Sequence, residues 1–457
     1  MNSAILTDTP GLSFGQSLGQ NLGDLQQAIR GAGGFLPAAP QTLEETGLTP
    51  ALIEQLIFKT IHFRGEAIGR ELAAVLGLRY SLIDPIIDHL RRQRMVEVKG
   101  SAGYGNVSSV FVLSEAGRAR AREHLDANQY TGAAPVPVAQ YVEAVRAQRL
   151  KNGWLTRDAL ADAYRHMVMA DDVLMRIGPA VNSGKSFLVY GQPGNGKTYL
   201  AEALFHIHSS PIYLPYALEC QGVIVKLFDP VYHQKIEQSS GASSLSIDTG
   251  YDGRWALCKR PFIVTGGELS LEMLDLSYNP NAKVYDAPFQ LKANNGIYLI
   301  DDFGRQKASP AEVLNRWIVP MDRRVDYLTF HTGGKVEVPF ETFLIFSTNL
   351  QPEKLGDEAF LRRIQYKMFL RSPGEEEFLE IFLRYCASQN LECTPELVNA
   401  LIESRYRPAA KRFRRCQPRD IINHATDLIN FECLEPRLTL DILERSFDSC
   451  SVEVCDD

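Results

Sequence analysis

The chain has 457 residues, of which 45% are hydrophobic and 23% charged, and its 48 basic and 55 acidic side chains give a formal net charge of -7. This composition excludes a collagen-like chain and a small disulfide-rich scaffold, and it argues against a polybasic binder of nucleic acid, while the length suffices for about three domains. Because the chain has no apolar run of about 18 residues, no basic and apolar leader over residues 1–10 and no C-x-x-C pair among its eight cysteines, we expect a cytoplasmic protein with reduced thiols and no membrane span.

The first 48 residues predict a flexible N-terminal tail. Residues 11–40 are rich in Gly, Ala, Gln and Pro and carry only two charged side chains. Such a segment buries too little apolar surface to offset the entropy of ordering it. Thr49 followed by Pro50 is typical of a helix start, with an N-cap and a first-turn proline, so we place the first domain boundary after residue 48.

Residues 49–128 predict a small domain. Apolar residues at helical spacing, alternating apolar runs and a tight turn with two glycines follow one another along this segment. The predicted helices cover 51–59, 65–78, 81–92 and 114–125, and the predicted strands 95–99 and 108–113 flank the turn at 103–106. Three helices followed by a hairpin and a last helix resemble the winged-helix fold.

The partner of this winged helix stays open on sequence grounds. The resemblance implies DNA binding through the third helix, which lies in the major groove in such folds. Three arginines end that helix, but Asp84 and Asp88 lie on it too, and residues 51–128 hold 11 basic against nine acidic side chains. DNA binding and protein docking are therefore both hypotheses for this domain.

Residues 129–140 predict a semi-rigid linker. They carry no charge and include Pro135 and Pro137, which hold the chain extended. We expect a second, larger domain to begin at residue 141.

A phosphate-binding loop lies in this second domain. Residues 186–190 (SFLVY) predict a buried strand, residues 191–198 (GQPGNGKT) match G-x-x-x-x-G-K-[ST], and residues 199–206 predict a helix. Glycines let backbone N–H groups curl around phosphates, and the helix N-terminus adds a positive dipole. Lys197 is predicted to supply charge to the β- and γ-phosphates and the Thr198 hydroxyl to ligate Mg²⁺. The residues predicted to bind the nucleotide are Gly191, Pro193, Gly194, Asn195, Gly196, Lys197, Thr198 and Tyr199.

Two later strands end in polar side chains. Residues 296–300 (GIYLI) predict a buried strand that ends at Asp301 and Asp302, and residues 342–347 predict a strand shortly before Asn349. Ligands of open α/β sheets bind at the carboxyl ends of the strands. We therefore predict that Asp301 ligates Mg²⁺, that Asp302 orients or polarises the attacking water, and that Asn349 reaches the γ-phosphate or the water.

In this order of motifs the chain resembles the AAA+ ATPases over residues 145–450. The matching segments are GQPGNGKT as Walker A, IYLIDD as Walker B, FSTN as sensor 1, DEAFLRRI as the arginine-finger segment and QPRD as sensor 2. The resemblance implies an α/β P-loop NTPase core over residues 141–371, a C-terminal helical lid over residues 372–457, and ATP and Mg²⁺ as cofactors.

The resemblance also implies roles for three arginines. Arg362 or Arg363 would reach the γ-phosphate bound to a neighbouring subunit, and of the two we favour Arg363. Arg419 would contact the phosphate from the lid. An arginine that acts on a neighbour implies a homo-oligomeric ring, a hexamer, because each site is then completed at a subunit interface.

Two features depart from the AAA+ pattern. Most members carry Asp-Glu in Walker B, whereas this chain carries Asp-Asp, so the hydrolysis rate is in question. The interval between Walker A and Walker B is also long, which predicts an insertion near residues 219–293. Tyr251, Arg254 and Trp255 in this insertion either line a ring pore or belong to its own core. A hairpin predicted over residues 328–340 resembles the MoxR, chelatase and helicase-loader branch of the family.

Three functions fit these observations. The first is an ATP-driven, chaperone-like machine that remodels a protein partner, with the winged helix as adaptor. The second is a DNA-associated ATPase, such as a loader, a helicase-like motor or a regulator, in which the winged helix binds DNA. The third is a switch that binds ATP and hydrolyses little of it. The full set of sensor motifs favours hydrolysis, and the near-neutral winged helix favours the protein partner.

Overall fold

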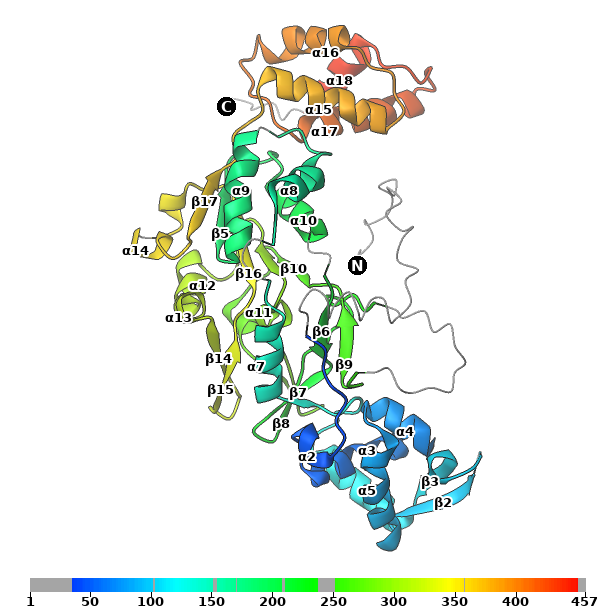
Figure 1. The fold of residues 1–457 in the computed structure, drawn as a ribbon. Helices are drawn as coiled ribbons and strands as arrows, with labels where there is room; N and C mark the ends of the chain where they lie inside the picture. The colour runs from blue at the N-terminus through cyan, green and yellow to red at the C-terminus, as the bar shows by residue number, and fades with distance from the viewer. Residues whose placement is uncertain are drawn as a thin grey trace.

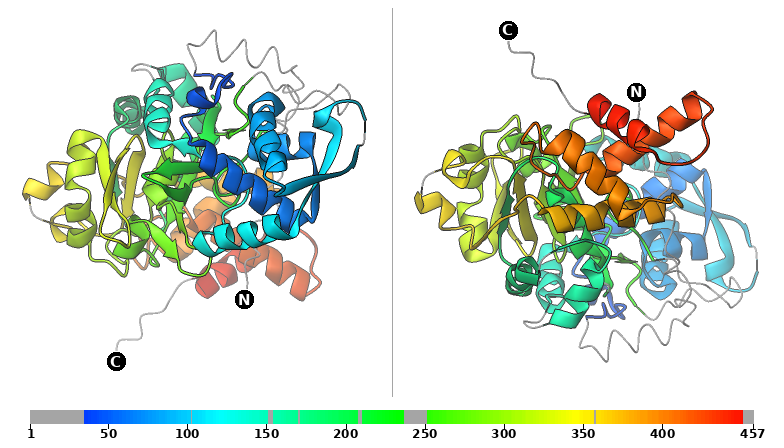
Figure 2. Two further views of the ribbon diagram at one scale, coloured as in Figure 1. Left: turned by 90° about the horizontal axis from the view of Figure 1, so that it is seen from below. Right: turned by 90° about the horizontal axis from the view of Figure 1, so that it is seen from above.

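The computed structural model describes residues 35–101, 103–150, 154–169, 171–207, 210–236, 251–356 and 358–450. Figure 1 shows an elongated molecule with a small N-terminal domain, a central α/β domain and a helical C-terminal domain. Seen from above in Figure 2, the helical domain lies over the central domain. No helix within the described ranges is long and apolar enough to cross a membrane.

The small N-terminal domain contains the helices and strands predicted for it. Its elements are α3 (Pro50–Arg64), β1 (Glu66–Ile68), α4 (Gly69–Leu76), α5 (Tyr80–Arg92), β2 (Val96–Ser101), η1 (Asn106–Ser108), β3 (Ser109–Leu113) and α6 (Glu115–Ala127). The side chains of Thr49 and Ser114 cap α3 and α6. The helix predicted from residue 65 begins only at Gly69, because the three residues before it form β1 and pair with β3 in the antiparallel sheet β1-β3-β2.

The prediction of a flexible tail up to residue 48 is wrong for residues 35–48. The ring of Phe35 lies 5.8 Å from that of Trp255, and a short helix, α2 (Leu43–Thr46), is capped by Thr42. The partner Trp255 lies far along the chain, so the local composition gives no sign of this contact. The remainder of the predicted tail lies outside the described residues.

The segment predicted as a linker, 129–140, belongs to the folded core. Ala134 and Val136 are fully buried, and β4 (Val136–Pro137) pairs in parallel with β7 (Ala217–Cys220). β4 is the last strand of its sheet, and an edge position tolerates prolines because no ladder bond is lost on the open side. The two prolines therefore lie in and just before an edge strand, and the segment is not a free linker.

A five-stranded parallel sheet in the order β10-β13-β16-β5-β17 forms the centre of the α/β domain. Its strands are β5 (Phe187–Tyr190), β10 (Phe262–Thr265), β13 (Ile297–Ile300), β16 (Phe343–Thr348) and β17 (Tyr366–Phe369). Along β5, Phe187 and Val189 pack on one side of the sheet and Leu188 on the other. Both faces are thus buried, which is the usual situation of a parallel sheet and explains the continuous apolar runs in the sequence.

Helices cover the two faces of this sheet. One face packs against α8 (Arg157–Tyr164), α9 (Asp171–Ser183) and α10 (Lys197–Ile207), and the other against α12 (Pro310–Arg316) and the segments next to it, including α13 (Ile318–Arg323). Ser309 and Glu312 form a capping box at the start of α12, since the side chain of each accepts a hydrogen bond from the backbone amide of the other. Further short elements are α11 (Phe289–Lys292), η2 (Leu271–Leu274), η3 (Pro352–Lys354) and α14 (Glu358–Leu361).

A second, mixed sheet in the order β11-β12-β8-β7-β4 lies between the central sheet and the small domain. This sheet shares one hydrophobic core with the two-stranded ladder β6-β9, the hairpin β14-β15 and helix α7. The bounds are β6 (Ile212–Pro215), β8 (Val223–Lys226), β9 (Trp255–Cys258), β11 (Ser277–Asn279), β12 (Val284–Asp286), β14 (Val325–Thr329), β15 (Lys335–Pro339) and α7 (Val138–Ala147). The predicted insertion at 219–293 is therefore not one unit, because β10 inside it belongs to the central sheet. The hairpin predicted before sensor 1 is present as β14-β15.

The pore-lining interpretation of three insertion residues is wrong. Tyr251, Arg254 and Trp255 are all buried. The Arg254 guanidinium pairs with Asp252 at 2.8 Å and donates to the Thr46 carbonyl at 2.8 Å. These contacts fix the insertion to the N-terminal segment, and the alternative of a core role is the correct one.

The C-terminal region is an all-helical domain. It consists of α15 (Glu375–Ser388), α16 (Pro395–Leu401), a π-helical turn η4 (Ile402–Tyr406), α17 (Gln417–Phe431) and α18 (Leu440–Cys450). Its buried core is built from its own residues. The α/β fold with a parallel sheet and a helical C-terminal region, as predicted for a P-loop NTPase core with a helical lid, is therefore confirmed.

Candidate nucleotide-binding site

The loop between β5 and α10 has the backbone expected for a phosphate cradle. Gly194 and Gly196 lie in the left-handed region, with φ of 78° and 85°, where a side chain would be strained. α10 starts directly after the loop, at Lys197. Backbone amides and the N-terminus of α10 therefore converge where an anion can bind.

Lys197 sits within this loop and contacts the end of the neighbouring strand β16. Its ammonium lies 2.7 Å from Asn349 Oδ1 and 3.2 Å from the Gly191 carbonyl. Burial lowers the pKa of the ammonium, and the carboxylates of Asp302 and Asp301 oppose this shift. The three predicted residues Lys197, Asp302 and Asn349 are thus close together.

Asp301 and Thr198 form the candidate Mg²⁺ site. The Thr198 hydroxyl donates to Asp301 Oδ2 at 2.9 Å, so a hydroxyl and a carboxylate oxygen meet at the end of β13. Mg²⁺ is commonly held by one or two carboxylates together with waters and substrate phosphates, and this donor set fits it. Within the described part of the chain, no group of three or more His, Cys, Asp or Glu side chains forms another metal centre.

Asp302 follows in a sharp turn after β13. Its φ is 48°, in the left-handed region, and its Oδ1 accepts a hydrogen bond from Asn349 Nδ2 at 2.8 Å. Gln306 Nε2 donates to the carbonyls of Asp301 at 2.8 Å and Asp302 at 3.2 Å. Gln306 thus holds the turn that orients both carboxylates, a role that sequence reasoning missed because glutamine in a loop carries no distinctive pattern.

Two other residues that were predicted to bind the nucleotide, Asn195 and Tyr199, contact other parts of the protein. The buried Asn195 donates from Nδ2 to Ser372 Oγ at 3.3 Å, in the segment that leads to the helical domain. Tyr199 is half exposed and its ring meets that of His166 edge to face at 5.5 Å. Pro193 lies in the loop itself, before the glycine turn.

The helical domain touches the phosphate-binding loop through the start of α17. The Cys416 amide donates to the Gly194 carbonyl at 2.9 Å, and a Cβ built on Gly194 would meet Cys416 Sγ at 2.5 Å and Arg414 Cδ at 3.6 Å. Arg419 is exposed and pairs with its neighbour Asp420 at 3.0 Å. The segment just before α17 thus lies against the glycine turn of the loop, and the sequence motifs did not indicate Arg414 or Cys416 as part of the site.

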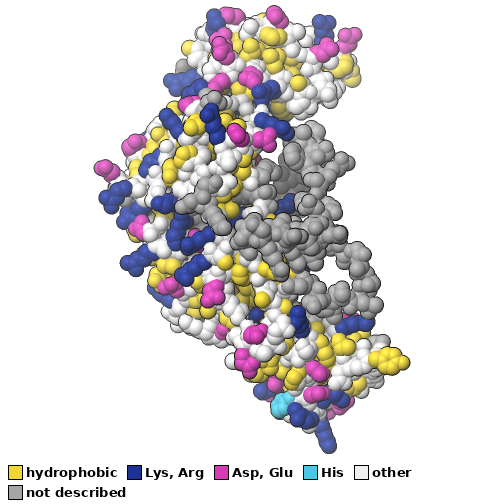
Figure 3. Space-filling view, in the orientation of Figure 1, with side chains coloured by type: hydrophobic (Ala, Val, Ile, Leu, Met, Phe, Trp, Pro, Cys, Tyr) yellow, Lys and Arg dark blue, Asp and Glu magenta, His cyan; other side chains and the backbone are white. Residues whose placement is uncertain are grey.

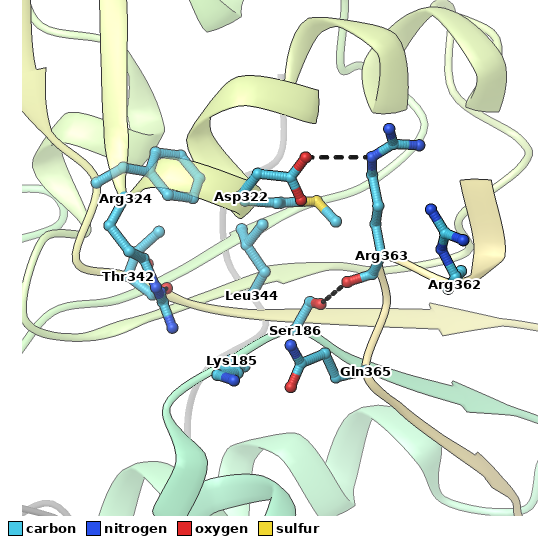
Figure 4. Close-up of a pocket in the computed structure, with 11 residues that line it drawn as sticks. Lys185, Ser186, Asp322, Arg324, Thr342, Leu344, Arg362, Arg363 and Gln365 are labelled. Atoms are coloured by element: carbon cyan, nitrogen blue, oxygen red, sulfur yellow. Dashed lines mark hydrogen bonds and ion pairs between the residues drawn. The ribbon is translucent and has the colours of Figure 1, made fainter. Parts of the chain in front are cut away.

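Arg362 and Arg363 lie at the opposite edge of the sheet from the phosphate-binding loop. The Arg363 carbonyl accepts a hydrogen bond from Ser186 Oγ at 3.1 Å, and Ser186 precedes β5, whereas the loop follows it. A strand of four residues spans about 13 Å. The two arginines therefore lie about the length of a strand from the nucleotide site of their own chain, and Figure 4 shows Arg363 bonded to Asp322 of α13.

Comparisons with known proteins add little to this site. A family model described as a domain of unknown function (DUF8689) matches residues 374–449, the helical domain. No curated protein matches the chain.

Three solved structures resemble the chain at low identity. NtrX from Brucella abortus is 15% identical over 60% of this chain and 53% of its own, with a TM-score of 0.36. NtrX in complex with ATP is 14% identical over 95% and 82%, with a TM-score of 0.36, and a RuvB mutant from Thermotoga maritima is 13% identical over 62% and 71%, with a TM-score of 0.36. The chain thus spans about half the length of the first of these.

Proposed function

We propose that this chain, whose fold is that of an AAA+ P-loop ATPase, binds ATP with Mg²⁺ and hydrolyses it. The observation that carries this proposal is one continuous cluster at the carboxyl edge of the central sheet. Lys197 contacts Asn349, Asn349 contacts Asp302, and Thr198 contacts Asp301 next to it. Such a cluster combines the charge, the metal ligands and the carboxylate that phosphoryl transfer to water requires.

Each residue of the cluster has a separate proposed role. The loop amides and Lys197 bind the β- and γ-phosphates, and Thr198 and Asp301 hold Mg²⁺, which neutralises charge on the phosphates when bound. Asp302 accepts a hydrogen bond from the attacking water and orients it. Asn349, which contacts both Lys197 and Asp302, keeps these two groups in register with the γ-phosphate.

We further propose that the site is completed by a second copy of the chain in a ring, a hexamer. The support is that Arg362 and Arg363 lie at the edge opposite to their own nucleotide site. Arg363 is engaged by Asp322 at 3.4 Å, whereas Arg362 is exposed and has no side-chain hydrogen bond or ion pair to any described residue. The geometry thus favours Arg362 as the finger, in place of the Arg363 that the sequence favoured.

The helical domain supplies the response to the nucleotide in this proposal. The Cys416 amide donates to the Gly194 carbonyl of the loop, Arg414 lies two residues before it, and Arg419 lies in the first turn of the helix that follows. A change in the phosphates would therefore shift α17 and the domain around it. We retain Arg419 as a phosphate contact of the nucleotide-bound form and add Arg414 to it.

We propose a protein as the partner that this machine remodels, in a chaperone-like activity. The small domain, interpreted as a winged helix over residues 49–128, shares one buried core with Ala217, Ile224 and Val284 of the second sheet, so it moves with the ATPase domain. Two of its cations are paired, Arg91 with Asp88 at 3.0 Å and Lys99 with Glu66 at 2.6 Å, which weakens it as a DNA-binding surface.

Binding of DNA by the small domain is the alternative function, and a nucleotide switch with little hydrolysis is another. We also propose a cytoplasmic location, which the seven described cysteines, all free thiols, support.

An ATPase assay on the full chain tests the proposal. We expect Mg²⁺-dependent turnover that chelation of Mg²⁺ abolishes and that Lys197→Ala reduces to background. Lys307→Ala is the matched control, because Lys307 is exposed and its ammonium forms no hydrogen bond or ion pair with a described residue. If the chain binds ATP but shows no turnover, the result favours the nucleotide switch. If DNA stimulates turnover and the binding of DNA is sensitive to salt, the result favours the DNA-associated ATPase.

A further inference from the structure

A cavity of about 330 Å³ opens at the edge of the central sheet opposite to the phosphate-binding loop. Among the side chains that line it are Lys185, Ser186, Asp322, Arg324, Arg362 and Arg363. They come from the starts of β5 and β17 and from the end of α13, as Figure 4 shows. Elements far apart in the sequence thus bring four cations and one carboxylate together.

Among the described residues, one of the four cations forms an ion pair, and Glu341 acts on a second, Arg324, only at longer range. Arg363 pairs with Asp322 at 3.4 Å. Arg324 donates to two carbonyl oxygens, those of Gly184 at 2.7 Å and Thr342 at 3.5 Å, and forms no ion pair with a described residue. The Lys185 ammonium and the Arg362 guanidinium have neither a hydrogen bond nor an ion pair within the described ranges.

The position of Arg324 adds a second argument. It ends α13 with a φ of 59°, in the left-handed region that glycine normally occupies at a helix end. A side chain at such a position is strained. The guanidinium has five N–H donors, so donors remain after the two carbonyl contacts. Figure 3 shows Lys and Arg side chains gathered on the part of the surface that corresponds to α12 to α14.

We propose that this cavity is a second phosphate-binding site, distinct from the loop at residues 191–198. Arg forks and a Lys ammonium are the groups that bind phosphate oxygens, and the volume lies at the lower end of the range for ligand pockets. The ligand is therefore a small phosphoanion, or one phosphate group of a larger molecule.

Two sources can present this phosphate. One is a free phosphoanion in solution. The other is the terminal phosphate of a nucleotide bound to a second copy of the chain, and this second source rests on the ring proposed above. In both cases Lys185 and Arg324, which lie outside the arginine-finger segment, are the new ligands.

The first experiment measures binding of inorganic pyrophosphate to the full chain by calorimetry. Every protein in this experiment carries Lys197→Ala, which weakens binding at the phosphate-binding loop. The protein is kept at concentrations where sedimentation shows single chains. We expect Lys185→Ala to weaken pyrophosphate binding by about tenfold or more, the loss typical of one charge-assisted contact. Lys335→Ala, at an exposed lysine of β15 that does not line the cavity, is the matched control and should leave binding unchanged.

The second experiment measures ATP turnover of the assembled chain with an intact Lys197. If the phosphate comes from a neighbouring copy, Lys185→Ala lowers kcat with KM unchanged, while Lys335→Ala has no effect. A response to Lys185→Ala in either experiment supports the site and identifies its source. If Lys185→Ala changes neither pyrophosphate binding nor kcat, the second site is overturned, whereas turnover that depends on Lys197 would still support the proposed ATPase.

Discussion

The two edges of the central sheet differ in how their charged groups are satisfied. At the carboxyl edge, Lys197 contacts Asn349 and Asn349 contacts Asp302, while Thr198 contacts Asp301. At the opposite edge, the cations of the cavity lack carboxylate partners among the described residues except for the ion pair of Arg363 with Asp322. The charged groups of one edge are thus satisfied by one another, whereas the cations of the other edge are those for which we propose a phosphate as the partner.

The largest effect is expected from the arginines of the second edge. Arg362→Ala should lower ATP turnover by about 10³-fold or more, because an arginine finger stabilises the charge of the transition state by that order. Affinity for ATP should stay unchanged, since the residue lies at the far edge. Steady-state turnover and nucleotide binding measure the two quantities, and Arg363→Ala should have the smaller effect because Asp322 already engages that side chain.

A mixing experiment decides whether the two edges act on one another in neighbouring copies. Lys197→Ala chains and Arg362→Ala chains are each expected to be inactive. Mixed together they should regain part of the turnover, because some interfaces then combine an intact loop with an intact arginine. Full activity of single Arg362→Ala chains at high dilution would contradict the division of roles between the edges.

The next effect is expected at Asp302. Asp302→Asn keeps the shape and an acceptor for Asn349 but removes the negative charge, so turnover should fall by about 10²-fold or more, as for loss of a general base. ATP affinity should be largely kept. Asp302→Glu is the second variant and should retain turnover, because it restores the carboxylate. If Asp302→Asn turns over at the rate of the unchanged protein, the carboxyl edge is not the catalytic one.

A smaller effect is expected at Asn349. Asn349→Ala removes the contacts to both Lys197 and Asp302, and hydrogen bonds to charged groups are worth about 1.5–3 kcal/mol. We therefore expect kcat to fall by about tenfold. Asn315→Ala, at an exposed asparagine of α12, is the control and should leave kcat unchanged. Equal effects of the two variants would mean that the contact network does not position the reacting groups.

The carboxyl edge was predictable because its residues follow local patterns. A glycine-rich loop after an apolar run and carboxylates after a second run determine their own backbone geometry, and parallel strands then bring them together. The contacts Thr198–Asp301 and Lys197–Asn349 join residues more than 100 positions apart, yet each partner stands at the end of a recognisable strand.

The rest of the molecule was not predictable in this way. Residues 129–140 have the composition of a linker, yet two of them form β4, which is stabilised by pairing with β7. Arginine is usually found at the protein surface, yet an ion pair with Asp252 allows Arg254 to be buried. Lys185 and Arg324 each lie in segments without a recognisable motif, and only the topology brings them to the cavity that Arg362 also lines.

The smallest effect is expected from a neutral change at the second edge. Ser186 is buried and its hydroxyl donates to the Arg363 carbonyl at 3.1 Å, which ties the arginine segment to the start of β5. Ser186→Ala should lower the free energy of unfolding by about 1 kcal/mol, the usual worth of one such bond, as measured by urea denaturation. Because the charge of the cavity is unchanged, turnover should fall only a few-fold through a less fixed arginine, and ATP affinity should not change. A loss of ATP affinity instead would mean that the arginine segment acts on the nucleotide of its own chain, and the two edges would then form one site.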